Sequence, residues 1–330
     1  MRRLILGIES SCDDTAAALV TEEGEVVASV IANQTELHNR YGGVFPALAS
    51  RAHVEAISAT IFTALSQGNI GRDEVVAIGV TRGPGLVGSL QVGINAASGL
   101  ALAWDKPLIG VNHLRGHLRS ADLEERRVEY PALVLLVSGG HTIISHMRNE
   151  TDIEILGTTR DDSTGEAYDK VGRMLGLGYP GGPAIDKLAR SGTPQIQFPR
   201  PMLNDGYEFS FSGLKSSVAR HREKFPDFSS ADVAASFVEA CLDVLMTKCR
   251  LAITSLPVRS LVIVGGVAAS PQLRERAADL CDSQKISLCL PPLQWSTDNA
   301  AMIALAAWDY YKLGVFPDVA AQARIPLSEF

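Results

Sequence analysis

One arrangement of apolar runs and polar turns occurs twice along the chain, and it constrains the fold more than any other feature. The run Leu4–Ile8 leads through the polar turn Glu9–Asp14 into a second run, Ala16–Val20. The same order returns later, where Ala132–Val137 leads through a tight turn with two glycines into His141–Met147. Short apolar runs bounded by turn residues predict strands. Each half of the chain is therefore predicted to begin with a strand, a polar turn and a second strand.

Each half also ends with the same predicted elements, a strand, a glycine-bearing loop and a helix. Val75–Val80 reads as a buried strand that runs into a glycine-bearing loop and a helix to about Ala103. Leu261–Val264 runs into Gly265-Gly266 and a helix to about Cys281. Strands that alternate with helices favour α/β architecture. We therefore predict a duplicated α/β fold with two lobes.

The predicted boundaries follow from this duplication. The first lobe is expected at residues 1–110, completed by the C-terminal segment 302–330, and the second at 111–301. A mostly helical insertion is expected at about 160–255, because Ala235–Ala252 places its apolar residues on one helical face. The 330 residues, 46% of them hydrophobic, suffice for two cores.

Charge and cysteine content limit the function. The net charge is −7, so the surface as a whole does not attract nucleic acid, and an RNA contact needs a local basic patch or a partner protein. The five cysteines are odd in number and form no C-x-x-C pair, which favours free thiols in a reducing compartment. The apolar start of the chain ends too early for a secretory signal, because Glu9, Asp13 and Asp14 interrupt it. No stretch approaches the 18 apolar residues of a membrane span, so we expect a soluble, cytoplasmic protein.

A histidine pair indicates a metal site. His113 and His117 are four residues apart, which places both on one helix face, where two imidazoles can bind one borderline cation such as zinc or ferrous iron. A polar helix surface is the competing interpretation. A peptidase zinc helix carries a glutamate directly after its first histidine, and here Leu114 stands there. The late Asp298 is the candidate third ligand.

Four glycine-bearing loops are candidates for anion binding. They are Gly83–Gly88, Ser138–Gly140, Gly176–Gly182 and Gly265-Gly266. Glycines after strands let backbone N–H groups approach a phosphate, although turns also use glycine. Loops in both halves that face one another would hold a nucleotide in a cleft between the lobes. The chain has no P-loop motif, and the G-x-G-x-x-G spacing at Gly83 lacks the acidic ribose ligand of a dinucleotide fold.

Several charged residues have two interpretations. Asp169 and Asp186 either accept hydrogen bonds from a ribose or simply stabilise helix N-termini. The segment Phe209–Lys215 combines aromatics, hydroxyls and a lysine, and its aromatics are more often core than stacking platforms. Arg115, Arg119, Arg126 and Arg127 form either a phosphate patch or an ordinary solvated face.

Taken together, these segments resemble the bacterial tRNA adenosine threonylcarbamoyltransferase family, TsaD, of the actin-like ATPase, sugar kinase and Hsp70 (ASKHA) superfamily. The resemblance runs nearly end to end and rests on ordered motifs. They include Gly7-Ile-Glu-Ser-Ser-Cys-Asp-Asp-Thr15, Gly42-Gly-Val-Phe-Pro46, Gly83-Pro-Gly-Leu-Val-Gly88, the histidine pair, Val137-Ser-Gly-Gly-His-Thr142, Gly165-Glu-Ala-Tyr-Asp-Lys170, Leu175–Pro183, Phe198-Pro-Arg-Pro201, Phe209–Lys215, Gly265-Gly-Val267 and Thr297-Asp-Asn-Ala300.

The resemblance implies two binding sites. His113, His117 and Asp298 would hold one divalent ion per subunit, Fe²⁺ or Zn²⁺, and Mg²⁺ would accompany the nucleotide. The binding site for the threonylcarbamoyl adenylate would be lined by Leu136, Val137, Ser138, Gly139, Gly140, Asp169, Gly182 and Asp186. The chain departs from the family at two places. Ser270 stands near the nucleotide where the family usually has asparagine, and Arg115 stands where an acidic residue is frequent and is not expected to bind the metal.

The implied reaction moves a threonylcarbamoyl group from its anhydride with AMP to the adenosine 3′ of the anticodon in tRNAs that read ANN codons. AMP is released, and no general base is evident. The implied partners are tRNA, a shorter TsaB-like paralogue that pairs with the first lobe, and a small TsaE-like ATPase; no membrane is involved. The alternatives are an ATPase or phosphotransferase of the same fold and a non-catalytic scaffold paralogue, with a metallopeptidase third.

Overall fold

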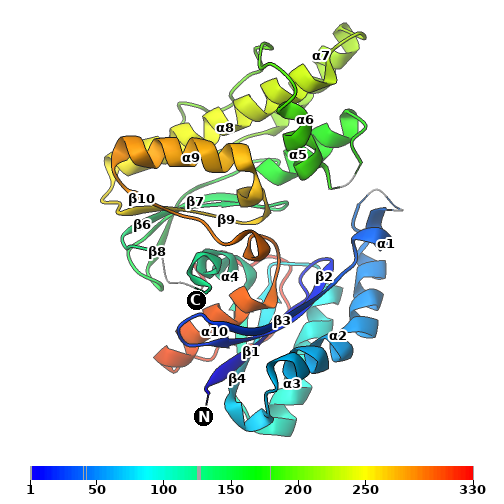
Figure 1. Cartoon of the computed structure of the whole chain (residues 1–330), viewed down its shortest axis with the longest axis vertical. Helices are drawn as coiled ribbons and strands as arrows, with labels where there is room; N and C mark the ends of the chain where they lie inside the picture. The colour runs from blue at the N-terminus through cyan, green and yellow to red at the C-terminus, as the bar shows by residue number, and fades with distance from the viewer. Residues whose placement is uncertain (1, 40, 42, 125–127, 179, 330) are drawn as a thin grey trace. The chain divides into compact units, whose positions relative to one another are not determined.

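The computed structural model describes residues 2–39, 41, 43–124, 128–178 and 180–329 (Figure 1). The chain divides into two compact units. Unit 1 comprises Met1–Arg127 and Pro291–Phe330, and unit 2 comprises Val128–Leu290. The sequence pattern predicts a second lobe at 111–301, which would contain the histidine pair and Asp298, whereas in the structure all three residues belong to unit 1.

Each unit is built on a five-stranded sheet. Unit 1 has the order β3-β2-β1-β4-β5 and unit 2 the order β10-β9-β6-β7-β8. In unit 1 the strands are β1 (Leu4–Glu9), β2 (Asp14–Thr21), β3 (Val26–Asn33), β4 (Val75–Gly83) and β5 (Leu108–Asn112). In unit 2 they are β6 (Ala132–Val137), β7 (Thr142–Met147), β8 (Ile153–Thr158), β9 (Ser260–Val264) and β10 (Ser287–Cys289).

The two sheets repeat one topology. In unit 1, β1 pairs antiparallel with β2 and parallel with β4, while β3 and β5 form the edges. In unit 2, β6 takes the place of β1, because it pairs antiparallel with β7 and parallel with β9, with β8 and β10 at the edges. This repetition confirms the duplicated α/β fold predicted from the sequence.

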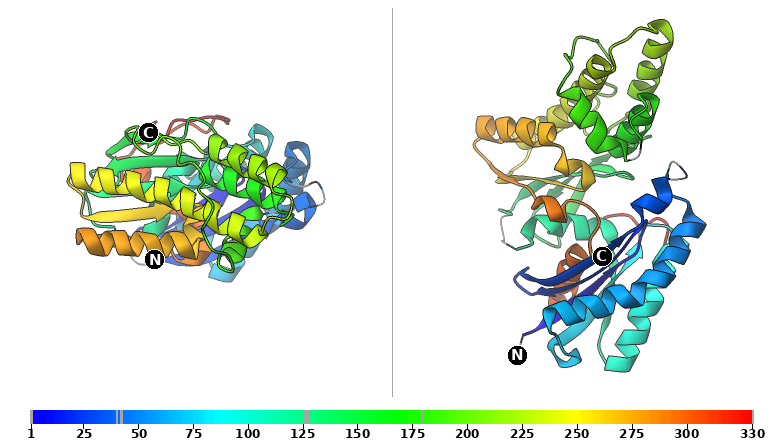
Figure 2. Two further views of the ribbon diagram at one scale, coloured as in Figure 1. Left: turned by 90° about the horizontal axis from the view of Figure 1, so that it is seen from above. Right: turned by 45° about the vertical axis from the view of Figure 1, so that its right-hand side comes forward.

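Helices cover both sheets. Unit 1 contains α1 (Thr35–Asn39), α2 (Pro46–Gly68), α3 (Val87–Trp104), α4 (His113–Arg119) and α10 (Ala300–Leu313). Unit 2 contains α5 (Thr164–Met174), α6 (Gly181–Ala189), α7 (Ser212–Lys224), α8 (Ser230–Ser255) and α9 (Pro271–Gln284). The first four helices of unit 2 occupy the expected insertion, and α8 and α9 lie side by side over its sheet (Figure 2). Among the described residues, no helix is long and apolar enough to cross a bilayer.

The sheet of unit 1 is buried on both faces. Successive side chains of a strand point to opposite faces, and in β1 the side chain of Ile5 packs with α10 while Leu4 and Leu6 pack with the cluster of α2 and α3. This explains why β1 is apolar at nearly every position instead of alternating with polar residues.

Two glycines let α10 lie unusually close to this sheet. A Cβ on Gly7 of β1 would approach the backbone of Ala300 and would lie 2.8 Å from the Ala304 nitrogen. A Cβ on Gly79 of β4 would lie 2.6 Å from the Cβ of Ala307. Side chains at these positions would push α10 outward. Because Asp298 stands just before α10, these glycines determine where its carboxylate lies.

Candidate functional site

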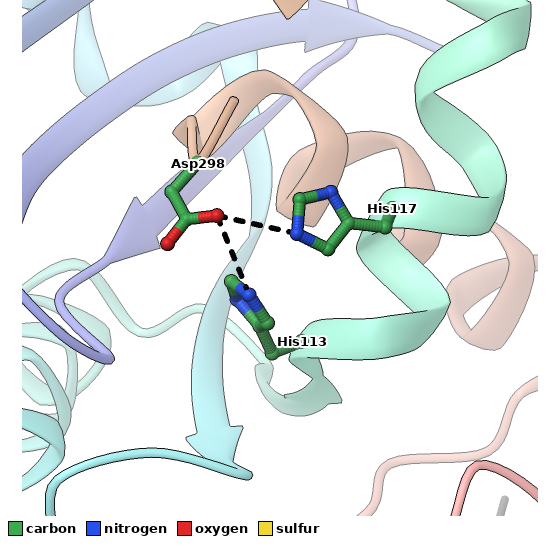
Figure 3. A group of neighbouring side chains, drawn as sticks. All are labelled: His113, His117 and Asp298. Atoms are coloured by element: carbon green, nitrogen blue, oxygen red, sulfur yellow. Dashed lines mark ion pairs between the residues drawn. The ribbon is translucent and has the colours of Figure 1, made fainter. Parts of the chain in front are cut away.

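Three side chains of unit 1 converge as the sequence predicted (Figure 3). The Asp298 carboxylate oxygen lies 3.2 Å from Nε2 of His117 and 3.5 Å from Nε2 of His113. The candidate ligand atoms of the three residues all lie within 4.8 Å of one another. Two imidazole nitrogens and one carboxylate are a donor set suited to zinc or ferrous iron. This group can therefore hold a metal ion.

The histidines are placed by the junction of β5 and α4. Asn112 ends β5 and caps α4, because its side-chain oxygen accepts the N–H of Leu114 at 3.0 Å. Its amide nitrogen donates to the Pro326 carbonyl at 3.0 Å, which fixes the cap against the C-terminal segment. The helix therefore begins at His113, and His117 follows one turn later on the same face.

The aspartate is placed by close packing between α4 and α10. Gly116 lies between the two histidines, and a Cβ there would come within 2.7 Å of the Ile303 side chain on α10. Asn299 caps α10 by accepting the Met302 N–H at 2.9 Å. The absence of a side chain at Gly116 therefore lets α10 bring the preceding Asp298 to the histidines.

A buried glutamate orients the first histidine. Oε2 of Glu9 lies 2.9 Å from Nδ1 of His113. Glu9 is itself fixed, since it accepts the Thr81 hydroxyl at 2.6 Å and the Ser11 N–H at 2.5 Å. A carboxylate on Nδ1 selects the tautomer and ring orientation that turn Nε2 toward a metal. Glu9 was not predicted as a site residue, although it lies within the first motif that carries the family resemblance.

The protonation of this pair follows from its burial. Burial lowers the pKa of His113, but the charges of Glu9 and Asp298 outweigh it and raise the pKa to about 9. Burial raises the pKa of Glu9, but the charge and hydrogen bond of His113 outweigh it and leave the pKa lowered. In the metal-free protein the two residues therefore form a buried ion pair at neutral pH.

The second histidine supports the fit of a metal ion. His117 is fully buried, and neither of its ring nitrogens makes a hydrogen bond among the described residues. Nε2 faces only the Asp298 carboxylate, at 3.2 Å. A buried polar atom without a hydrogen bond is costly, and a cation held with His113 and Asp298 would satisfy this nitrogen. Leu114 is buried in the core, so no general base follows His113 as in a peptidase helix.

The two described members of the arginine cluster are buried. Arg115 and Arg119 are each only 7% exposed. Nε of Arg119 lies 2.9 Å from Asp309, and its guanidinium also pairs with Asp122. Both interpretations from the sequence, a phosphate patch and a solvated face, are therefore wrong for these two residues, because α4 is enclosed on all sides. Arg126 and Arg127 lie outside the described residues.

The glycines of the first anion-loop candidate serve packing instead. A Cβ on Gly85 would lie 2.6 Å from the Ser11 carbonyl oxygen. A Cβ on Gly83, which has a φ of +152°, would meet the backbone of Gln322. The protein's own chain therefore fills the space where a phosphate was hypothesised.

The turn Ser138–Gly140 in unit 2 has a different character. Ser138 closes the turn through hydrogen bonds with His141, and Ser163 at the N-terminus of α5 donates to the Gly139 carbonyl at 2.7 Å. Cβ atoms added to Gly139 or Gly140 would meet no protein atom within 4 Å. The glycine backbone is therefore open to a ligand. Leu136 and Val137 are buried, so only their backbone could take part.

The remaining candidates lie on the helices that follow. Oδ1 of Asp169 accepts the Gly181 N–H at 2.8 Å and thereby ties α5 to the start of α6. Burial raises the pKa of Asp169, while hydrogen bonds from Gly181 and Gly182 oppose the rise. A Cβ on Gly182 would meet open space. The structure therefore brings Asp169 and Gly182 together.

Ser270 and Asp186 form a second pair. The Ser270 hydroxyl caps α9 by accepting the Leu273 N–H at 3.3 Å. Burial raises the pKa of Asp186, and a hydrogen bond with Ser270 opposes this rise. The side chain that departs from the family pattern is therefore engaged in joining α9 to α6.

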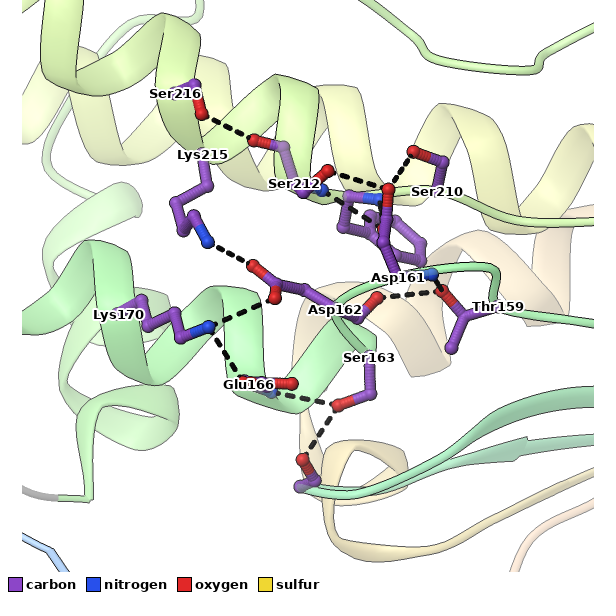
Figure 4. Close-up of polar contacts among 12 residues, drawn as sticks. Thr159, Asp161, Asp162, Ser163, Glu166, Lys170, Ser210, Ser212, Lys215 and Ser216 are labelled. Atoms are coloured by element: carbon purple, nitrogen blue, oxygen red, sulfur yellow. Dashed lines mark hydrogen bonds and ion pairs between the residues drawn. The ribbon is translucent and has the colours of Figure 1, made fainter.

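The Phe209–Lys215 segment is an internal anchor (Figure 4). Asp161 accepts hydrogen bonds from the hydroxyls of Ser210 and Ser212, at 2.5 and 2.6 Å, and from two backbone N–H groups. Asp162 pairs with Lys215 at 2.5 Å and with Lys170 at 3.0 Å. Phe209 and Phe211 are fully buried, as expected for core aromatics. The segment therefore joins α7 to the start of α5.

Comparison with solved structures identifies the class of fold. The structure resembles T. kodakarensis HypF with a TM-score of 0.65 and 13% sequence identity, covering 95% of this chain and 48% of that one. It resembles component A of the Acidaminococcus fermentans (R)-2-hydroxyglutaryl-CoA dehydratase with a TM-score of 0.58 and 15% identity, covering 94% and 99%. With the repeated sheets, these likenesses define a two-lobed protein of the ASKHA fold class.

Sequence comparison identifies the family within that class. The profile of TsaD, tRNA N6-adenosine threonylcarbamoyltransferase, matches residues 25–305. The enzyme of that name from Bacillus thuringiensis (strain Al Hakam) is 47% identical over 327 residues, which is 97% of this chain and 95% of the relative. That from Kosmotoga olearia is 45% identical and covers 98% of both chains. The chain belongs to the TsaD family of tRNA N6-adenosine threonylcarbamoyltransferases, as its motifs indicated.

Proposed function

We propose that this enzyme transfers a threonylcarbamoyl group from threonylcarbamoyl-AMP to N6 of the adenosine 3′ of the anticodon, in tRNAs that read ANN codons, and releases AMP. The observation that carries the proposal is the complete group of His113, His117 and Asp298 in a chain of this family. A scaffold paralogue has no need for two buried histidines turned toward one carboxylate, and a peptidase needs the glutamate that Leu114 replaces.

The metal we propose is Fe²⁺ or Zn²⁺, because the donor set contains two imidazoles. Bound there, such an ion supplies Lewis-acid polarisation of a carbonyl oxygen. The chain's own residues prepare the site. Glu9 fixes the ring of His113, and the closely packed α10 holds Asp298 against both histidines. The acceptor amine is a weak nucleophile, so a polarised carbonyl favours attack.

For the adenylate we propose a site on unit 2 around the turn Ser138–Gly140. Open space at the Cβ positions of Gly139 and Gly140 supports the close approach of a phosphate to backbone N–H groups. Asp169 and Asp186 supply carboxylates for ribose hydroxyls or for an accompanying Mg²⁺, with Gly182 beside Asp169. The other expected residues, Leu136, Val137 and Ser270, contribute through backbone position or helix capping.

A TsaB-like paralogue is the partner we propose for unit 1. The helix α3 contains no charged residue, and it packs against α2. Together the two helices expose large apolar side chains, with Val54 and Phe62 each 63% and Leu102 87% exposed. Exposed apolar side chains on two packed helices, one of them without charged residues, are typical of a protein–protein interface. A TsaE-like ATPase completes the proposed assembly. We propose a cytoplasmic location, because the acceptor is tRNA and all five cysteines are free.

The balance of products tests the proposed reaction. The assembled enzyme is incubated with threonylcarbamoyl-AMP and an unmodified tRNA, and both AMP and modified adenosine are measured. One AMP per modified adenosine is expected. When ATP replaces the adenylate, this chain incubated without the TsaE-like ATPase should release no orthophosphate. Orthophosphate release by this chain alone would instead identify an ATPase or phosphotransferase of the same fold. Wild-type yields of modified tRNA from His117→Ala would remove the metal group from the mechanism.

A further inference from the structure

An open pocket lies at the end of α7 in unit 2, outside the sites described above. It has a volume of about 520 Å³ and is formed where α7 ends and α8 begins. Figure 1 shows α7 at the edge of its unit, away from the sheet that α8 and α9 cover. Neither the metal group nor the proposed adenylate site uses any residue of this pocket, so its lining needs its own explanation.

Three aromatic rings contribute to the lining. His221, Phe225 and Phe228 all border the pocket. The ring centroids of His221 and Phe225 lie 4.8 Å apart, and Phe225 is 48% exposed. The Nζ atom of Lys224 lies 5.3 Å from the centroid of the Phe225 ring, and the half-exposed ring offers apolar surface to solvent beside these two neighbours. Such a surface is a stacking platform for a planar group such as a nucleobase.

The same helix end carries the local positive charge that the protein as a whole lacks. Four of the 13 residues of α7 are lysine or arginine and one is acidic, in a chain with a net charge of −7. Lys215 is bound to Asp162, but Arg220 and Lys224 are exposed and form no ion pair with a described residue. Because they are four residues apart, they share one helix face that leads to the pocket.

We propose that the end of α7 and this pocket form a docking site for an unpaired nucleotide of the tRNA, an inference that rests on the proposed function. The base stacks on Phe225 inside the pocket, and the neighbouring phosphates pair with Arg220 and Lys224. The buried Arg115 and Arg119 cannot provide this contact. The site gives a net-acidic enzyme a local basic surface for its acidic substrate.

The acidic lining residues support a base in the pocket, with the phosphates outside it. The Asp232 carboxylate already accepts hydrogen bonds from the Thr193 N–H at 2.8 Å and from the Gln195 amide at 3.0 Å. Asp227 is exposed at the rim, where it repels phosphate and can accept a hydrogen bond from the exocyclic amine of a base. Stacking and amine recognition are typical of proteins that bind unpaired nucleotides.

Stacking is tested with the full-length enzyme, its helper subunits and an unmodified tRNA transcript that reads an ANN codon. Phe225→Ala is expected to weaken tRNA affinity by roughly 5- to 100-fold, as for other base–aromatic contacts, while Phe225→Trp retains affinity. The matched control is Phe316→Ala, because Phe316 is 50% exposed and lies in unit 1. Equal affinities for Phe225→Ala and the control would overturn the proposal. A loss of helper-subunit binding in Phe225→Ala would overturn it too, by identifying a protein interface.

Phosphate pairing is tested by the dependence of tRNA affinity on salt. Arg220→Ser with Lys224→Ser is expected to flatten the slope of log affinity against log salt by about 1.5, since each phosphate contact contributes roughly 0.7–0.9. Arg250→Ser with Arg259→Ser removes the same charge from exposed positions of the same unit and should leave the slope unchanged. Equal slopes for both pairs would contradict the proposal.

The docking site at the end of α7 and the proposed transfer reaction can be refuted independently of each other. At saturating tRNA, the Phe225→Ala enzyme should retain its kcat, and its KM for the adenylate should not change, because only docking is weakened. A wild-type enzyme that makes no threonylcarbamoyl-adenosine, with tRNA affinity still dependent on Phe225, would overturn the reaction and leave the docking site standing. Normal tRNA modification, with a tRNA affinity that does not depend on Phe225, would refute the docking site and leave the proposed reaction standing.

Discussion

Replacement of Glu9 by glutamine tests how unit 1 prepares its metal site. The side chain keeps its shape but loses its charge and one acceptor oxygen, so it can keep the hydrogen bond from Thr81 or the one from Ser11, which donate to different oxygens of Glu9, but not both. The amide binds Nδ1 of His113 less strongly than the carboxylate at 2.9 Å does. Loss of such a supporting carboxylate typically lowers metal affinity about 10- to 100-fold.

A second effect of Glu9 opposes the first. The pKa of His113 is about 9 in the metal-free protein, because Glu9 and Asp298 outweigh the effect of burial. At pH 7, which is about two units below this pKa, a metal ion must displace the proton of His113. This competition weakens metal binding about 100-fold, or ~2.7 kcal/mol. Glu9→Gln lowers this pKa and so removes part of the competition. At pH 7 the two effects offset each other.

The two effects separate as the pH rises. Wild-type affinity should increase about tenfold per pH unit between pH 7 and 9 as His113 loses its proton, and the increase should end above pH 9. The variant should show a shallower increase. The ratio of wild-type to variant affinity therefore grows by up to about 100-fold across this range.

Competition titrations with a zinc chelator at several pH values measure this ratio, and thermal unfolding of the metal-free variant at pH 9 provides a folding control. A ratio independent of pH would refute the assignment of the proton to the pair of His113 and Glu9. A variant with wild-type affinity at pH 9 would show that Glu9 does not orient the histidine.

Three further substitutions test other parts of the structure. Gly139→Val should weaken adenylate binding in calorimetry without lowering stability, whereas Gly71→Val, also facing open space, should change neither; unchanged affinity would place the anion elsewhere. Gly7→Ala should destabilise the protein by about 3 kcal/mol and reduce bound zinc, because α10 must move outward; full zinc content would contradict this. Arg119→Ser should cost about 3–5 kcal/mol in denaturant unfolding by leaving buried carboxylates unpaired, and a stability loss under 1 kcal/mol would contradict it.

The sequence predicted those features that depend on local pattern. Apolar runs identified the main strands of each half, and the four-residue spacing of His113 and His117 correctly placed both on one helix. The repeated order of strands and loops predicted a duplicated fold, which the matching sheet topologies confirm. These features depend on the side-chain periods of strands, two residues, and of helices, 3.6 residues, and both periods can be read from a single sequence.

Features that depend on packing between distant segments could not be predicted. The glycines Gly7 and Gly116 looked like ordinary strand and helix residues, yet they allow α10 to approach and bring Asp298 to the histidines. The basic residues Arg115 and Arg119 were expected at the surface, because α4 has no apolar stripe, but every residue of this helix is buried. Gly83 and Gly85 were predicted to lie in a phosphate-binding loop. A sequence alone does not distinguish a glycine required for close backbone packing from one required for ligand binding.

Metal-dependent transfer to tRNA is tested most directly by mass spectrometry of nucleosides from a tRNA transcript treated with the assembled enzyme and threonylcarbamoyl-AMP. Enzyme stripped of metal and enzyme reloaded with Fe²⁺ or Zn²⁺ are compared, alongside His117→Ala treated identically. N6-threonylcarbamoyl-adenosine 3′ of the anticodon is expected only with reloaded wild-type enzyme. Equal yields of this nucleoside from the stripped enzyme, or from His117→Ala, would contradict metal-dependent transfer.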